Sequence, residues 1–300
     1  MIYASSSNCA SKRNVVIVMK HMQGKQMMLN KIMRKAYAKF LPKALRYPNV
    51  HLGGEEVRTL KLPFCKNHVV IRKSRSDVAR VCEYINEIYT SDGYLNNVLI
   101  ESKPTKLVDI GANIGLSTLN LIQKFPSIKE VIAVEAEEKN FEILEKNFAI
   151  WRKSFPNISF NAINAIASNA SGERYSISSL TDDPTLTASG TFRFEKISGD
   201  QEHHILESIN VGSCVIDTQG DANVIVKIDI EGGEEYLFHD NASWLEEVGF
   251  LTIELHDRYD VKLIETSKNV LKSLVDYDFA VHPANDVLHC YNRKLFKTTN

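Results

Sequence analysis

A glycine turn between an apolar strand and a helix is the first feature of this sequence that could do chemistry. The strand of residues 106–110 carries Asp109 near its end and runs into Gly111 and Gly115, where a helix is expected to begin. Glycine lets the backbone bend sharply and approach a ligand closely, and the N–H groups at a helix start attract polar groups. In an open parallel sheet, ligands bind beyond the carboxyl ends of the strands. The turn therefore predicts a site for the polar part of a nucleoside cofactor, with Asp109 facing the crevice.

The spacing of the glycines discriminates between nucleoside cofactors. A dinucleotide-binding turn has the pattern G-x-G-x-x-G, in which the second glycine lets the backbone reach a pyrophosphate. Here Asn113 and Leu116 occupy the places of the second and third glycines. NAD and FAD are disfavoured for that reason, and with them an oxidoreductase on a dinucleotide fold. A cofactor without phosphates fits an acid and a tight turn better, and S-adenosylmethionine is such a cofactor.

Acidic side chains end further strands of the same series. Glu135 follows the glycine turn by one strand, where a carboxylate can accept hydrogen bonds from both hydroxyls of a ribose. Asp229 and Glu231 end a later apolar strand and, because side chains alternate along a strand, lie on the same side of it. We interpret Asp229 as the floor of the active site, facing a methyl donor. Glu231 has two readings, as a site residue or as a cap of the next helix.

A histidine at another strand end is the candidate general base. Glu254 and His256 are two residues apart and therefore share a face of the strand. A histidine that is oriented by a carboxylate can take the proton of a hydroxyl group. His256 and Asp229 are the two candidates for this base, and a structural role of His256 is the alternative reading.

The sequence lacks the motifs of hydrolases with a nucleophilic serine, of metal sites and of disulfide frameworks. The sequence holds no G-x-S-x-G nucleophile turn. His203 and His204 are adjacent rather than at helical spacing, and Asp182 and Asp183 lie in a polar stretch, so no metal site is expected. The five cysteines form no C-x-x-C pair, which argues against a disulfide framework. Because neither a membrane-spanning run nor a secretory signal is evident, the cytoplasm is the expected location.

The elements that must position these residues alternate between strand and helix. Such a series of βαβ units has right-handed crossovers and forms a parallel sheet with helices on both faces. The two last strands predict a closing antiparallel pair, and residues 181–200 predict a mobile insertion that is either a lid or a surface loop. The expected strands are 69–72, 106–110, 131–136, 158–163, 174–178, 225–230, 250–254, 280–285 and 287–291, and the expected helices are 77–88, 115–125, 139–151, 233–239 and 261–277.

The charge is unevenly distributed along the 300 residues. The first 54 residues carry ten basic and no acidic residue, a net charge of +10, which leaves −11 for the rest of a chain whose total is −1. The acidic remainder is not an electrostatic footprint for nucleic acid. Residues 19–45 predict a basic amphipathic helix, which either contacts an anionic membrane surface or a partner, covers an edge of the domain, or is a transit-like presequence. The predicted domains are a basic extension, 1–54, and a cofactor-binding domain, 55–300.

Taken together, the motifs resemble those of the FkbM-type S-adenosylmethionine-dependent methyltransferases. The resemblance covers about residues 68–291 and rests on V-D-I-G-A-N-I-G from Val108, V-E-A from Val134, N-A-I-A-S from Asn164, V-K-I-D-I-E-G-G-E from Val226 and I-E-L-H from Ile253. It implies an α/β class I methyltransferase fold, Rossmann-like, with a mostly parallel sheet. It also implies that the turn of Asp109, Gly111, Asn113 and Gly115 holds the methionine part of S-adenosylmethionine and that Glu135 holds the ribose. The other predicted cofactor-binding residues are Ala112, Ala136, Asn164, Ala165 and Asp229.

Similar proteins methylate hydroxyl oxygens, often on sugars or polyketide-like natural products. The resemblance thus predicts an O-methyltransferase that acts on a small molecule or a glycan. The strand ends supply Asp229, Glu254 and His256 as the candidate catalytic residues, and the sequence predicts no bound metal. The alternative is a fold that binds S-adenosylmethionine without catalysis and serves as an interaction or regulatory module.

Overall fold

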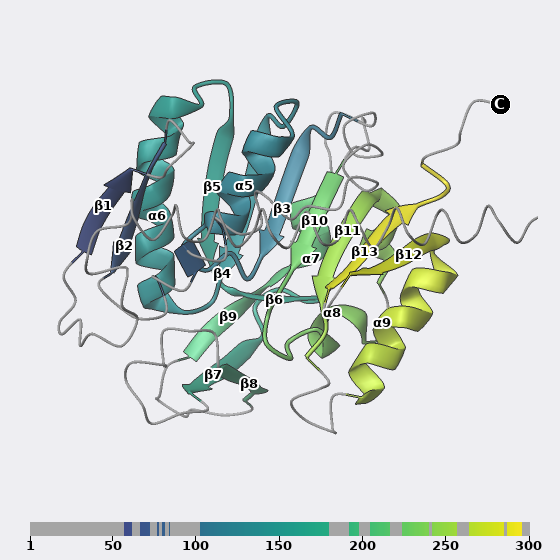
Figure 1. Ribbon diagram of the computed structural model, residues 1–300. Coiled ribbons are helices and arrows are strands. Elements are labelled where there is room, and N and C mark those ends of the chain that lie inside the picture. The colour runs from purple at the N-terminus through teal and green to yellow at the C-terminus, as the bar shows by residue number, and fades with distance from the viewer. Residues whose placement is uncertain are drawn as a thin grey trace, which may run out of the picture. The chain divides into compact units, whose positions relative to one another are not determined.

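The computed structural model of the protein describes residues 57–61, 67–72, 77, 80, 81, 84, 103–179, 192–197, 205–216, 224–239, 242–256, 264–284 and 287–295 (Figure 1). The expected basic extension of residues 1–54 lies outside this part of the chain, as do most of the expected helix 77–88 and residues 181–191 and 198–200 of the expected insertion. None of the helices formed by these described residues is long and apolar enough to span a membrane.

The main sheet has seven strands (Figure 1). The strand order is β12–β13–β11–β10–β3–β4–β5. The strands are β3 (Lys106–Ile110), β4 (Glu130–Glu135), β5 (Ser159–Asn164), β10 (Val224–Ile228), β11 (Val248–Glu254), β12 (Phe279–Ala284) and β13 (Val287–Asn292). The pairs from β5 to β11 are parallel, whereas β13 is antiparallel to both β11 and β12.

The order of the strands reverses at β3. The chain runs outward from β3 through β4 to β5 and then returns to the other side of β3 with β10. Such a reversal leaves a crevice outside the carboxyl ends of the two strands, where open α/β sheets bind their ligands. The predicted class I α/β fold, with its mostly parallel sheet and its antiparallel C-terminal pair, is confirmed.

Helices cover both faces of this sheet because its parallel strands are apolar on both sides. All five residues of β3 are buried. One face packs against α7 (Val211–Val215), α8 (Glu235–Phe238), the 3₁₀ helix η1 (Ser243–Glu247) and α9 (Ile264–Asp276) in a continuous core. The helices α5 (Leu116–Lys124) and α6 (Glu138–Ser154) contact β3, β4 and β5 on the other side.

A second sheet has four strands in the order β6–β9–β7–β8. These are β6 (Ile166–Ser168), β7 (Arg174–Ser179), β8 (Phe192–Lys196) and β9 (Ile205–Asn210). The strand β8 lies within the expected insertion 181–200, so the expectation of a loop was wrong for residues 192–196, where pairing with β7 supplies backbone hydrogen bonds. Neither β9 nor α7 was expected from the sequence.

A short antiparallel hairpin precedes the main sheet. It is formed by β1 (Val57–Lys61) and β2 (His68–Arg72). The strand β2 packs against α6, as its place beside that helix in Figure 1 shows. The hairpin thereby brings Arg72 to the helix that follows β4.

Candidate functional site

A pocket with an empty volume of about 630 Å³ opens at the reversal of the strand order. The residues that line it follow the carboxyl ends of β3, β4, β5 and β10, with one arginine from the segment before β3. They are Arg80, Ile110, Gly111, Asn113, Val134, Glu135, Ala136, Asn140, Ala165, Ile166, Ala167, Asp229, Ile230, Glu231 and Gly233.

The structure brings six of the ten predicted cofactor-binding residues to this pocket. The six are Gly111, Asn113, Glu135, Ala136, Ala165 and Asp229. The other four, Asp109, Ala112, Gly115 and Asn164, do not line it. The sequence did not single out Arg80 and Asn140, because neither belongs to a motif or ends a strand.

Glu135 presents a buried carboxylate to the pocket. Its Oε2 accepts a hydrogen bond from the backbone N–H of Asn113 at 2.7 Å, and its Oε1 accepts from the N–H of Glu137 at 3.0 Å and from Nδ2 of Asn140 at 3.3 Å. Burial raises the pKa of Glu135 even though these three donors lower it. The donors fix the orientation of the carboxylate, and Oε2, which accepts a single hydrogen bond, keeps a lone pair for a ligand hydroxyl.

The glycine turn is held between neighbouring strands. Gly111 has φ +76°, and a Cβ there would lie 1.8 Å from the carbonyl oxygen of Asp229. The backbone N–H of Gly111 donates to Val134 at 2.9 Å. Lys227 donates from Nζ to the carbonyl oxygen of Gly111 at 2.7 Å. Glycine is required at 111 because the end of β10 passes so close to the turn.

Asp109 supports this turn from inside the domain rather than from the crevice that the sequence predicted. Its side chain is fully buried, and its Oδ2 accepts hydrogen bonds from Ser117 at 2.9 Å and from Thr118 at 2.5 Å. Its Oδ1 lies 3.3 Å from Nζ of Lys227. The hydroxyl groups at the start of α5 draw the carboxylate under the turn, away from the pocket.

Gly115, Ala112 and Asn164 shape the surroundings of the pocket. A Cβ on Gly115, whose φ is +90°, would lie 2.8 Å from Leu144 and 3.0 Å from Trp151, so this glycine lets α5 and α6 pack closely. The carbonyl of Ala112 accepts from the N–H of Gly115 at 2.8 Å. Asn164 donates from Nδ2 to the carbonyl of Glu135 at 2.8 Å and closes the end of β4.

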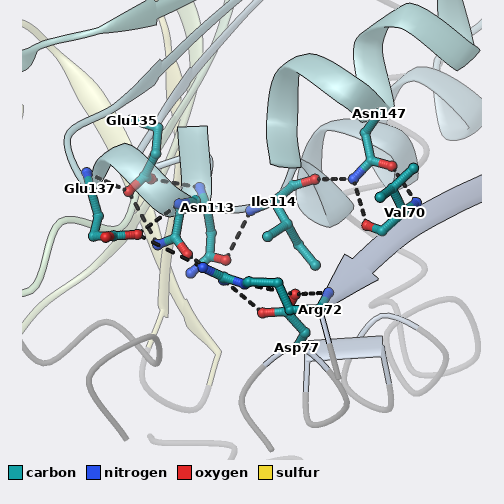
Figure 2. Close-up of polar contacts among 9 residues, drawn as sticks. Val70, Arg72, Asp77, Asn113, Ile114, Glu135, Glu137 and Asn147 are labelled. Carbon is teal, nitrogen blue, oxygen red and sulfur yellow. Dashed lines mark hydrogen bonds and ion pairs between the residues drawn. The ribbon is translucent and has the colours of Figure 1, made fainter. Parts of the chain in front are cut away.

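A buried polar network connects the hairpin with Glu135 (Figure 2). Arg72 donates to both carboxylate oxygens of Asp77, from Nη2 at 2.7 Å and from Nε at 3.2 Å, and its Nη2 also donates to Oδ1 of Asn140 at 2.6 Å. Asn140 in turn donates to Glu135. The carboxylate that faces the pocket is thereby connected to the end of β2.

A second link joins the hairpin to the glycine turn, on the right of Figure 2. Asn147 of α6 accepts a hydrogen bond from the N–H of Val70 at 2.5 Å and donates to the carbonyl of Val70 at 3.1 Å. Its Nδ2 also donates to the carbonyl of Ile114 at 2.8 Å. One fully buried side chain therefore pairs backbone groups of β2 and of the turn before α5.

The predicted catalytic residues come together at Asp229, which lines the pocket, whereas Glu254 and His256 do not line it. His256, 3% exposed, lies with Nε2 3.6 Å from Oδ1 of Asp229 and 4.0 Å from Oε1 of Glu254. Glu231 joins them, with Oε2 3.5 Å from the same nitrogen. The partner that orients the histidine is Glu234, whose Oε1 lies 2.7 Å from Nδ1, and not Glu254 as the sequence suggested. The chain after β10 turns at Glu231 and Gly232, which have φ +52° and +99°, and Glu234 follows this turn.

The charges in this cluster are coupled. Burial raises the pKa of Glu231 to about 7, although His256 opposes this shift. Burial also opposes ionisation of Asp229, but Lys227, Arg80 and His256 outweigh it and lower the pKa of Asp229. Burial of His256 lowers its pKa, yet the hydrogen bond to Glu234 and the nearby carboxylates raise it on balance. Asp229, Glu231 and His256 together offer donor atoms that could hold a metal ion.

No protein-family model matches the sequence, and no curated protein matches it. Solved structures do match. The methyltransferase FkbM from Methylobacillus flagellatus KT is 16% identical at a TM-score of 0.46, and the match covers 72% of this chain and 54% of that one. The chain thus spans about half the length of that protein.

Two further matches are SAH-bound methyltransferases. The Podospora anserina methyltransferase PaMTH1 is 11% identical at a TM-score of 0.35, with 97% of this chain and 99% of that one covered. An O-methyltransferase from Bacillus cereus in complex with SAH is 12% identical at a TM-score of 0.37, with 71% and 90% covered. Similarity of this degree does not establish function, and membership of the FkbM-type family therefore stays a prediction.

Proposed function

We propose that the protein is an S-adenosylmethionine-dependent methyltransferase that acts on a hydroxyl oxygen of a small molecule or a glycan. The observation that carries this proposal is the composition of one pocket. Glu135 lines one part of it and Asp229 and Glu231 line another, with Glu254 and His256 beside them. The pocket thus combines a carboxylate suited to a ribose with a group of side chains suited to accept a proton.

The pocket suits S-adenosylmethionine by the chemistry of its lining. Ile110, Val134, Ala165, Ile166 and Ala167 offer small or apolar surfaces for a flat base. The carboxylate of Glu135 suits ribose hydroxyls. The matched positions of the glycine turn carry no second and third glycine for a pyrophosphate, which supports a cofactor without phosphates.

When bound, S-adenosylmethionine supplies a methyl group on a sulfonium, which passes to the acceptor oxygen and leaves its bonding electrons on the sulfur. The residues of the chain have to align the two reactants and exclude water. A hydroxyl acceptor also loses a proton, and we propose that the cluster of Asp229, Glu254 and His256 receives it.

Binding of SAH to the purified full chain tests the cofactor, measured by isothermal titration calorimetry. Glu135→Ala should weaken binding by at least about tenfold, since charge-assisted hydrogen bonds contribute roughly 1.5–3 kcal/mol each. Glu142→Ala, on the exposed side of α6, is the matched control and should bind as the native chain does. Equal affinities of the two variants would remove Glu135 from the cofactor site.

Transfer of a labelled methyl group to a panel of sugars and hydroxylated small molecules tests the reaction. His256→Ala should slow transfer more than it weakens SAH binding. A protein that binds SAH but methylates no hydroxylated acceptor would instead fit the alternative of a non-catalytic module.

A further inference from the structure

Four potential ligand side chains converge at the ends of two neighbouring parallel strands. Asp229 and Glu231 follow β10, Glu254 is the last residue of β11, and His256 follows β11. Their carboxylate oxygens lie 3.5–4.0 Å from Nε2 of His256. The donor atoms of Asp229, Glu231 and His256 all lie within 4.8 Å of one another.

These distances are too long for hydrogen bonds between the side chains, which measure about 2.7–3.2 Å. They are ion-pair distances when His256 is protonated, and a cation among these side chains would take the place of that proton. Donors that each lie about 2.1 Å from one divalent ion are roughly 3.0 Å apart at adjacent corners of an octahedron and roughly 4.2 Å apart at opposite corners. The separations from Nε2 of His256 fall between these two limits.

The contact between Glu234 and His256 is of the kind that orients metal-binding histidines. Glu234 is 2% exposed in its side chain and contacts Nδ1 of His256 at 2.7 Å. A metal-ligating histidine almost always gives its other ring N–H to a carboxylate or carbonyl, which fixes the tautomer and aims the remaining nitrogen at the metal. With the proton on Nδ1, the lone pair of Nε2 is directed at Asp229 and Glu231. This observation is independent of the gathering of acids itself.

We propose that Asp229, Glu231 and His256 bind a divalent cation beside the cofactor pocket. Two carboxylates and one imidazole suit Mn²⁺, Fe²⁺ or Zn²⁺ better than a soft metal. The role of the ion rests on the proposed function: an acceptor hydroxyl that binds to it becomes more acidic. Glu254 then takes the hydroxyl proton, while the acceptor oxygen forms its bond to the methyl carbon and the sulfur keeps the electrons of the broken bond.

Binding of Mn²⁺ to the EDTA-treated full chain tests the proposal, followed by the loss of the free-ion signal in electron paramagnetic resonance. The native chain should bind one equivalent. Glu231→Gln and Asp229→Asn should each weaken binding by at least about tenfold. Glu234→Gln should weaken it about 10–100-fold through the orientation of His256. Glu265→Gln, an exposed acid of α9, is the control and should bind Mn²⁺ as the native chain does.

Circular dichroism and SAH affinity, measured on each variant, separate loss of the site from loss of the fold. A folded native chain that binds no Mn²⁺, or a folded Glu231→Gln variant that binds it as tightly as Glu265→Gln does, would overturn the proposal. Mn²⁺ binding without SAH binding would support the metal site and contradict the proposed function. SAH binding without Mn²⁺ binding would do the reverse.

Discussion

Removal of Arg72 should destabilise the domain through a charge that the fold has buried. Arg72→Met deletes both side-chain hydrogen bonds to Asp77, which is 1% exposed, and the bond to Asn140. Breaking a buried ion pair from one side costs about 3–5 kcal/mol. The N–H of residue 72 still donates to Asp77 at 2.7 Å, so we expect the lower value, about 3 kcal/mol. For a domain of this size that lowers Tm by roughly 6–12 °C.

Differential scanning calorimetry on two further variants tests the cause. Arg72→Met/Asp77→Asn should recover at least about 1 kcal/mol of the loss, because the double change removes the uncompensated charge. Lys268→Met breaks an exposed ion pair with Glu265 and should shift stability by less than about 1 kcal/mol. A double variant that is no more stable than Arg72→Met would refute the reasoning.

The remaining predictions concern the turn, the carboxylate that faces the pocket and the lysine beneath it. Gly111→Ala should destabilise the domain far more than Gly172→Ala, because both glycines have φ +76° but only Gly111 has a backbone oxygen where the Cβ would lie. Thermal unfolding compares the two variants, and equal losses of stability would show that φ alone matters. SAH affinity should fall as the pH decreases through the raised pKa of Glu135, because protonation of the carboxylate removes a hydrogen-bond acceptor. In Glu135→Gln the affinity should be lower and should not change with pH over that range. Calorimetry at several pH values measures both, and the same pH dependence in the variant as in the native chain would contradict the prediction. Lys227→Met leaves buried Asp109 without its cation and should cost about 3–5 kcal/mol in urea denaturation, whereas a loss under about 1 kcal/mol would show that Ser117 and Thr118 suffice.

The main sheet could be predicted because its strands are local apolar runs. Buried parallel strands such as β3 and β10 are continuous in hydrophobicity, and the helices between them have regular spacing. The small sheet was harder to predict. Its strands β8 and β9 are short and mix apolar with charged or polar residues, and their pairing with β7 depends on contacts far along the sequence. Pattern alone therefore reads such strands as loop.

The sequence could predict which site residues lie at strand ends, but it could not predict which side chains they contact. Glu135 and Asp229 follow apolar strands, so topology alone brings them to one edge. The partner of His256 is different, because Glu234 lies after two glycines whose path cannot be read from spacing. Asp109 also sits at a strand end, yet the hydroxyl groups of α5 hold its carboxylate inside.

Asn147 couples the stability of the hairpin to that of the turn beside the pocket. Its amide pairs with Val70 in β2 and with Ile114 in the turn, so opening one of these partners leaves buried polar groups of the other less well satisfied. Coupling of this kind is reciprocal. A ligand that rigidifies the turn should therefore slow hydrogen exchange at the amide of Val70, a reporter on the hairpin that touches no ligand itself.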